Sequence, residues 1–242
     1  MVQETSPVFL AKPDLPELVA RFEQLSRRLE TCFVAARGRA ASDRVSPGGL
    51  REILLAFFAG LDAPPPHDPV TAAQHSDRGL KALADLAQWA EILGDANLRA
   101  ALDEITLTVA GHIVDHGGSL HSVTPVVDAL ANIANHLRDP AVLAAVAEFI
   151  GRILRATPAA GADAEVQAAL RLLHLNRGIV ATRSHDVRLM TEVFEEIATR
   201  FPEDAAGFFR EGMEQMERLN YPAPVRDLMG RYFARYSHPT LH

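Results

Sequence analysis

The sequence has few of the residues on which several classes of site depend. Cys32 is the only cysteine among 242 residues, which excludes an intramolecular disulfide and a cysteine-based zinc site. We interpret Cys32 as a small core residue. Lys12 and Lys81 are the only lysines, and the bias toward alanine, leucine and arginine indicates GC-rich bacterial coding. No stretch approaches about 18 consecutive apolar residues, so no membrane span is predicted.

The charge pattern disfavours nucleic acid as a partner. The formal net charge is −7, and no basic run is longer than Arg27–Arg28. A nucleic-acid-binding protein needs a concentrated basic surface to displace counterions. The first residues lack the basic region and apolar run of a signal peptide, so a cytoplasmic location is expected. Removal of a leader would leave a periplasmic location open.

A proline-rich stretch separates two helical parts. One helix is predicted from Asp14, a suitable N-cap, to about Arg37, and a second from Ser46 to about residue 62. Three consecutive prolines begin at Pro64 and cannot continue a helix. We therefore expect N-terminal helices over 1–62, a connection over 63–74 and helical hairpins over 75–242. The connection is interpreted as a stiff loop inside a single domain, 1–242.

Residues 80–154 contain two copies of one helical hairpin. Residues 86–104 align with 130–148 at an offset of 44 residues, and both copies place apolar residues on one helical face. Each hairpin turns at an aspartate, Asp95 or Asp139, which is expected to cap the returning helix. The opposite face of the first helix of each copy is polar and is predicted to be solvated. Its members are Gln88, Glu91, Asp128, Asn132, Asn135 and His136.

Paired helices at this period resemble HEAT-like or other, TPR-like, helical-hairpin repeats. The period is too long for the tetratricopeptide unit of about 34 residues. The resemblance is architectural, covers two repeats and implies no functional residues. It predicts an all-α fold of about ten helices, in which antiparallel hairpins stack as an α-solenoid or a helical bundle.

The pattern weakens after Thr157. Helices are predicted from about Asp163 to Arg177, from Ser184, from Phe201 through Leu219, and over Val225–Tyr236. The sequence Ser184-His185-Asp186 contains the residue types of a catalytic triad, but three consecutive residues cannot converge on one reacting atom. We interpret Ser184 as the N-cap of the following helix.

Histidines mark the end of the first returning helix. His112 and His116 are spaced i and i+4 and continue its core-facing stripe, with His121 a few residues further on. Such a pair can share a metal ion, with His121 as a weak third candidate. Neither a His-Glu-x-x-His nor a Glu-x-x-His motif is present. The histidines are therefore interpreted first as structural, with cleft-lining and metal-binding roles left open.

These patterns favour a non-enzymatic binding protein, a helical-repeat scaffold for a protein partner. The alternative is a carrier of an apolar small molecule, such as a lipid or sterol-like ligand, in a cavity between helices. A weaker alternative is a metal-dependent enzyme at the histidines. No catalytic residue and no cofactor is predicted. The candidate ligand-binding residues are Trp89, Val109, His112, His116 and Phe149.

Overall fold

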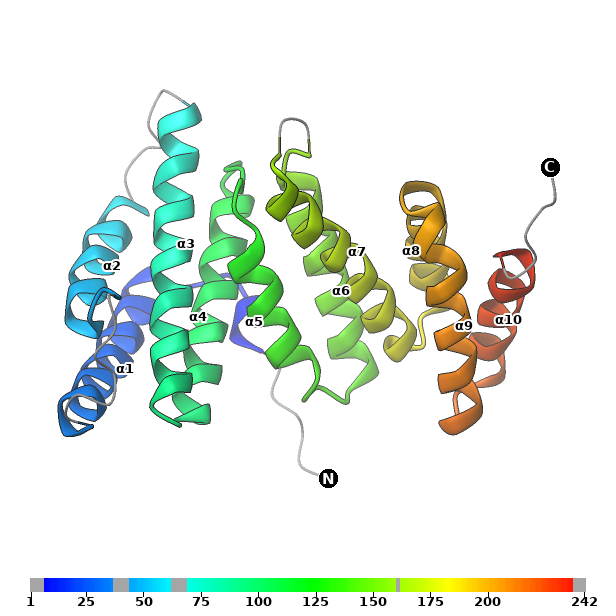
Figure 1. Ribbon diagram of the computed structural model, residues 1–242, viewed down its shortest axis with the longest axis horizontal. Helices are drawn as coiled ribbons and strands as arrows, with labels where there is room; N and C mark the ends of the chain where they lie inside the picture. The colour runs from blue at the N-terminus through cyan, green and yellow to red at the C-terminus, as the bar shows by residue number, and fades with distance from the viewer. Residues whose placement is uncertain (1–6, 37–43, 62–68, 160–161, 237–242) are drawn as a thin grey trace. The chain divides into compact units, whose positions relative to one another are not determined.

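The computed structural model describes residues 7–36, 44–61, 69–159 and 162–236 (Figure 1). Within these ranges the chain forms ten α-helices and one short 3-10 helix, with no strand, which confirms the all-α prediction. The elements are η1 (Val8–Leu10), α1 (Leu15–Ala35), α2 (Pro47–Leu61), α3 (Pro69–Ile92), α4 (Ala96–Asp115), α5 (Thr124–Ala134), α6 (Pro140–Ala156), α7 (Ala164–Ser184), α8 (Val187–Arg200), α9 (Pro202–Arg218) and α10 (Ala223–Tyr236).

Aspartate caps set several helix starts, as the sequence predicts. The Asp14 carboxylate accepts a hydrogen bond from the Glu17 amide at 3.2 Å, and Asp95 accepts one from the Leu98 amide at 2.9 Å. Asp139 accepts one from the Ala141 amide at 2.7 Å. Each carboxylate satisfies an amide that has no partner within the helix, so the chain turns at these positions.

The prediction that Ser184 caps α8 is wrong. Helix α7 continues to Ser184, whose hydroxyl donates to the Ala181 carbonyl oxygen at 2.7 Å. The N-cap of α8 is Asp186, which accepts from the Leu189 amide at 3.0 Å. Between them, His185 has a φ of 61°, a left-handed conformation that reverses the chain.

Two other boundaries differ from the predicted ones. Helix α3 begins at Pro69, so residues 69–74 of the expected connection are helical, while 63–68 lie outside the described residues. Helix α7 passes through Gly178 instead of ending at Arg177. A Cβ atom at Gly178 would lie 2.6 Å from atoms of Ile197 and of Phe208. The glycine therefore lets α7 approach neighbouring side chains closely instead of ending the helix.

The described chain divides into two compact units whose segments alternate. Unit 1 comprises the described residues within Met1–His136 and Arg155–Ala169, and unit 2 those within Leu137–Leu154 and Leu170–His242. The expectation of a single domain stays a prediction. The two copies of the sequence repeat correspond to α3 with α4 and to α5 with α6.

Helix α4 is the centre of unit 1. It packs against α3, α5, α1 and η1, and α2 packs against α1 and α3 (Figure 1). The apolar stripe predicted for the repeat is buried on α4, where Leu98, Leu102 and Ile105 are inaccessible to solvent. Burial of such side chains stabilises the fold by about 1.5–3 kcal/mol each.

In unit 2, α8, α9 and α10 pack on one another around aromatic rings. The ring centroid of Phe209 lies 5.2 Å from that of Phe194 and 5.1 Å from that of Tyr232. The Tyr232 hydroxyl donates to the Glu195 carboxylate at 2.8 Å. Burial, followed by this hydrogen bond, raises the pKa of Tyr232 to about 12. These aromatic residues fill space between helices, as a hydrophobic core requires.

Candidate binding cleft

The candidate ligand-binding residues predicted from the sequence are mostly packed in the core. Val109 and Phe149 are fully buried, and Phe149 belongs to unit 2 whereas the others belong to unit 1. Trp89 is buried, and its indole Nε1 donates to the Val45 carbonyl oxygen at 2.9 Å. Three of the five residues are therefore committed to core packing, and a ligand-binding role for the set stays a prediction.

The two helical histidines lie against each other at the end of α4. Their ring centroids are 4.1 Å apart, and Nδ1 of His116 lies 2.7 Å from the His112 carbonyl oxygen. His112 is buried, but His116 is exposed because the helix ends at Asp115 and His116 occupies the C-cap. The expectation that both rings face the core is correct only for His112.

His121 is exposed, and its backbone amide donates to the Asp77 carboxylate at 3.2 Å. Over the part of the chain that the structure describes, no group of three His, Cys, Asp or Glu side chains is placed to hold a metal ion. A metal role for His112, His116 and His121 stays a prediction.

A polar cleft of about 340 Å³ lies between α3, α4 and α5 of unit 1. We call it the acidic cleft, because its lining includes four carboxylates and a single guanidinium. Helix α4 contributes from one side and the polar faces of α3 and α5 from the others. The lining residues are Ala84, Asp85, Gln88, Glu91, Arg99, Asp103, Thr106, Pro125, Asp128, Ala131 and Asn132.

Asp103 is the buried carboxylate of the acidic cleft, with only 2% of its surface exposed. Arg99 Nε donates to both of its oxygens, at 2.9 and 3.0 Å, and Asn132 Nδ2 donates to Oδ2 at 3.0 Å. Burial raises the pKa of Asp103 above its ordinary value of 3.8. The charge of Arg99 and the bonds from Asn132 and Arg99 oppose this shift, while Asp128 adds to it.

Arg99 is already engaged within the cleft. Besides Asp103, it pairs with Glu91, whose Oε2 lies 2.6 Å from Nη1. Among the described residues, Asp85 and Asp128 have no ion-pair partner, so their charges stay uncompensated at the cleft. The cleft therefore carries an excess of negative charge, to which Asp85 on α3 and Asp128 on α5 contribute.

The polar faces of the two repeat copies are the sequence signal for this cleft, although by themselves they predict only exposure to solvent. The helical pattern places four of the cleft's residues on a polar face, and the structure shows all four exposed: Gln88, Glu91, Asp128 and Asn132. The face lines a cleft because α3 and α5, equivalent helices of the two repeat copies, contact each other as well as α4. The sequence indicates a shared site only in that the equivalent faces of both repeat copies are polar.

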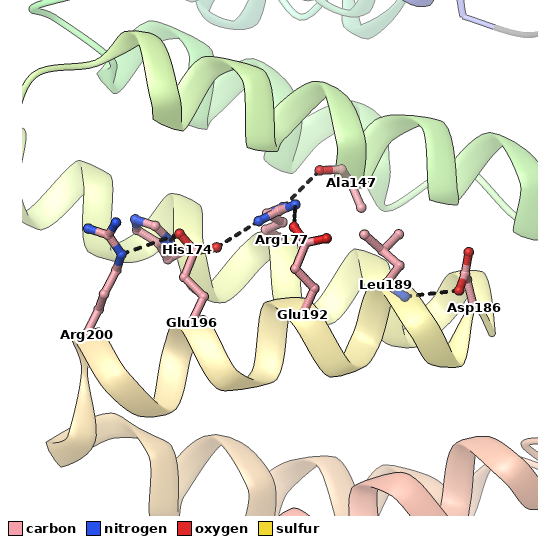
Figure 2. A network of polar contacts seen from close by, with 8 residues as sticks. All are labelled: Ala147, His174, Arg177, Asp186, Leu189, Glu192, Glu196 and Arg200. Atoms are coloured by element: carbon pink, nitrogen blue, oxygen red, sulfur yellow. Dashed lines mark hydrogen bonds and ion pairs between the residues drawn. The ribbon is translucent and has the colours of Figure 1, made fainter.

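A second polar cluster lies in unit 2 around Arg177, which is only 3% exposed (Figure 2). Its Nη1 lies 2.7 Å from Glu196 Oε2 and its Nη2 lies 2.8 Å from Glu192 Oε1, while Nε donates to the Ala147 carbonyl oxygen at 3.1 Å. The guanidinium thereby joins α6, α7 and α8.

His174 lies beside this cluster, with Nδ1 3.4 Å from Glu196 Oε1. Burial lowers the pKa of His174 below 6.5, and it outweighs the opposing effect of Glu196; Arg200 and Arg177 lower the pKa further. The imidazole is therefore neutral at neutral pH. With the charge of Arg177 matched and its hydrogen bonds satisfied, we interpret the cluster as structural.

No known protein family matches the chain, and neither a curated protein nor a solved structure matches it. Within the described ranges, no helix is both long and apolar enough to span a bilayer. The interpretation of function therefore depends on the acidic cleft itself.

Proposed function

We propose that this protein is a non-enzymatic scaffold of the helical-hairpin repeat type, whose acidic cleft binds a cationic segment of a partner protein. The observation that carries the proposal is the charge of the cleft. Four carboxylates line it, and its single guanidinium is already shared between Asp103 and Glu91. A partner that brings arginine or lysine side chains would compensate the remaining charge.

The geometry of the cleft favours a segment over a small apolar molecule. Its volume of about 340 Å³ accommodates a few side chains. Arginine is the best-matched side chain, because its planar guanidinium donates to carboxylates in a bidentate manner. Asp85 on α3 and Asp128 on α5 are the carboxylates available to it. The overall charge of −7 would also accelerate the approach of a basic partner.

The repeat supports the same proposal. In stacked helical hairpins, equivalent helices of successive repeats line a continuous binding surface. Helices α3 and α5 are equivalent in the sequence repeat, and their equivalent polar faces line the cleft. Selection for stability alone would require only the apolar stripes to recur. We propose that the polar faces, which lie opposite the apolar stripes, bind the partner.

The test measures binding of a labelled peptide by fluorescence anisotropy. The probe is a fluorescein-labelled peptide with four arginines separated by glycines, and the same peptide with citrulline in place of arginine tests the need for charge. We expect Asp85→Asn/Asp128→Asn to weaken binding of the arginine peptide about tenfold or more, since two partly screened ion pairs are lost.

A matched control separates the cleft from the general charge of the protein. Glu211→Gln/Glu217→Gln changes the net charge by the same amount at two exposed positions of α9, in unit 2. This control should bind the peptide as the wild type does. Equal weakening in both double variants would show non-specific attraction and would refute the proposal. The apolar-carrier and metal-enzyme alternatives stay untested predictions.

A further inference from the structure

Asp103 differs from the other carboxylates of the acidic cleft in being buried and in accepting from Arg99 Nε with both of its oxygens. Asp85, Glu91 and Asp128 retain access to solvent, whereas Asp103 is enclosed and bonded to Arg99 and Asn132. A buried carboxylate takes up a proton at a higher pH than an exposed one, because burial penalises its charged form. The raised pKa of Asp103 agrees with this expectation.

Protonation of Asp103 would change the cleft in two ways. The lining would then hold three charged carboxylates and one guanidinium instead of four and one. Arg99 would also lose the negative charge of the group that accepts its Nε hydrogen, and its only remaining ion-pair partner in the cleft would be the exposed Glu91. The positive charge of Arg99 would thus oppose a cationic ligand more strongly.

We propose that the Asp103–Arg99 pair is a proton-operated switch that makes the acidic cleft release its cationic partner in mild acid. This inference rests on the proposed function. The partner binds while Asp103 is charged and shares the charge of Arg99 with Glu91, and it dissociates once Asp103 is protonated and Arg99 is paired with Glu91 alone. Binding of a cation to the cleft would in turn lower the pKa of Asp103, by linkage.

Other charged groups lie near Asp103 and can also contribute to the pH dependence of binding. Helix α3 contributes Asp85 and Glu91, and α5 contributes Asp128. From α1, Arg21 pairs with Glu104 instead, at 2.5 Å, and η1 carries no charged side chain. These carboxylates also line the cleft, so their contribution to any pH dependence of binding must be separated from that of Asp103.

The experiment follows the dissociation constant of the arginine peptide from about pH 7.5 to about pH 4.5. For the wild type we expect about tenfold weakening, with a midpoint above the range of an ordinary aspartate. Asp103→Asn imitates the protonated carboxyl in shape and charge. It should bind about tenfold more weakly at neutral pH and lose most of the pH dependence.

Two further measurements keep the inference testable if Asp103→Asn fails to fold. Arg99→Gln removes the largest stabiliser of the charged carboxylate, so it should move the midpoint of the remaining pH dependence to higher pH. In the wild type, the carboxyl ¹³C signal of Asp103 should titrate with the same midpoint as peptide binding.

The possible outcomes separate the inference from the function on which it rests. If the wild type binds the arginine peptide at no pH, the proposed function fails. If it binds but Asp103→Asn keeps the wild-type affinity and pH dependence, the cleft binds cations without this switch. A carboxyl titration of Asp103 well below the binding midpoint would equally overturn the switch.

Discussion

Replacement of Arg177 by methionine should lower the stability of unit 2 substantially. Methionine keeps much of the aliphatic volume but removes all three donors, to Ala147, Glu192 and Glu196. Loss of the hydrogen bond that the charged guanidinium makes to the Ala147 carbonyl oxygen costs about 1.5–3 kcal/mol. Removal of one partner from a fully buried ion pair costs about 3–5 kcal/mol.

The exposure of the two glutamates decides how much of that cost applies. Glu192 has a side chain that is 54% exposed, so it regains water when Arg177 is absent, whereas the Glu196 side chain is only 24% exposed. Methionine also avoids the cost of burying a charged guanidinium, and this offsets a further part of the lost stability. We therefore expect a loss of about 2–4 kcal/mol in the free energy of unfolding, between the single-bond and the full ion-pair costs.

Urea denaturation followed by circular dichroism measures this loss. With an m-value of about 2 kcal/mol/M, the midpoint should fall by about 1–2 M. Arg171→Met removes an exposed arginine that pairs with Asp204, and it should leave the midpoint nearly unchanged. A fall of less than about 0.3 M for Arg177→Met would contradict the view that the buried guanidinium stabilises the contact among α6, α7 and α8.

Two other predictions concern the same cluster. Gly151→Ala should destabilise the protein in the same denaturation assay, although alanine favours a helix by about 1 kcal/mol, because the new Cβ would lie 2.8 Å from Arg177 Nη2; a raised midpoint would contradict this. Because the pKa of His174 is lowered in the folded protein, the unfolded chain binds a proton more readily than the folded protein as the pH falls below 6.5. The free energy of unfolding therefore decreases as the pH falls. His174→Gln should therefore reduce the loss of stability on acidification below about pH 6.5, and an unchanged slope would show that other groups cause it.

Much of the fold follows from local patterns. The apolar stripes of α3 to α6 are read from spacing along one chain, and the caps Asp14, Asp95 and Asp139 act on amides two or three residues away. These interactions need no distant partner, which is why the number and class of helices could be predicted. The Ser184 cap was predicted wrongly because Asp186, two residues further on, is also a residue type that caps helices, and the backbone reversal at His185 places Asp186 at the start of α8.

The acidic cleft and the Arg177 cluster depend on contacts between helices. A helical wheel shows that Gln88 and Asp128 lie opposite the core, but it cannot show that α3 and α5 turn these faces toward one cleft. Nor does a single arginine or glycine indicate that Arg177 and Gly151 meet, since they are brought together by packing of α7 on α6.

The amino-acid sequence by itself determined which apolar helix faces avoid water, because periodicity along one helix expresses that preference directly. Only the tertiary structure decided which polar residues share a site. The burial of Asp103, and its hydrogen bond from Asn132, arise from the approach of three helices that are separate in the sequence. Desolvation and charge pairing act through space, so their effects on Asp103 appear only when those helices are assembled.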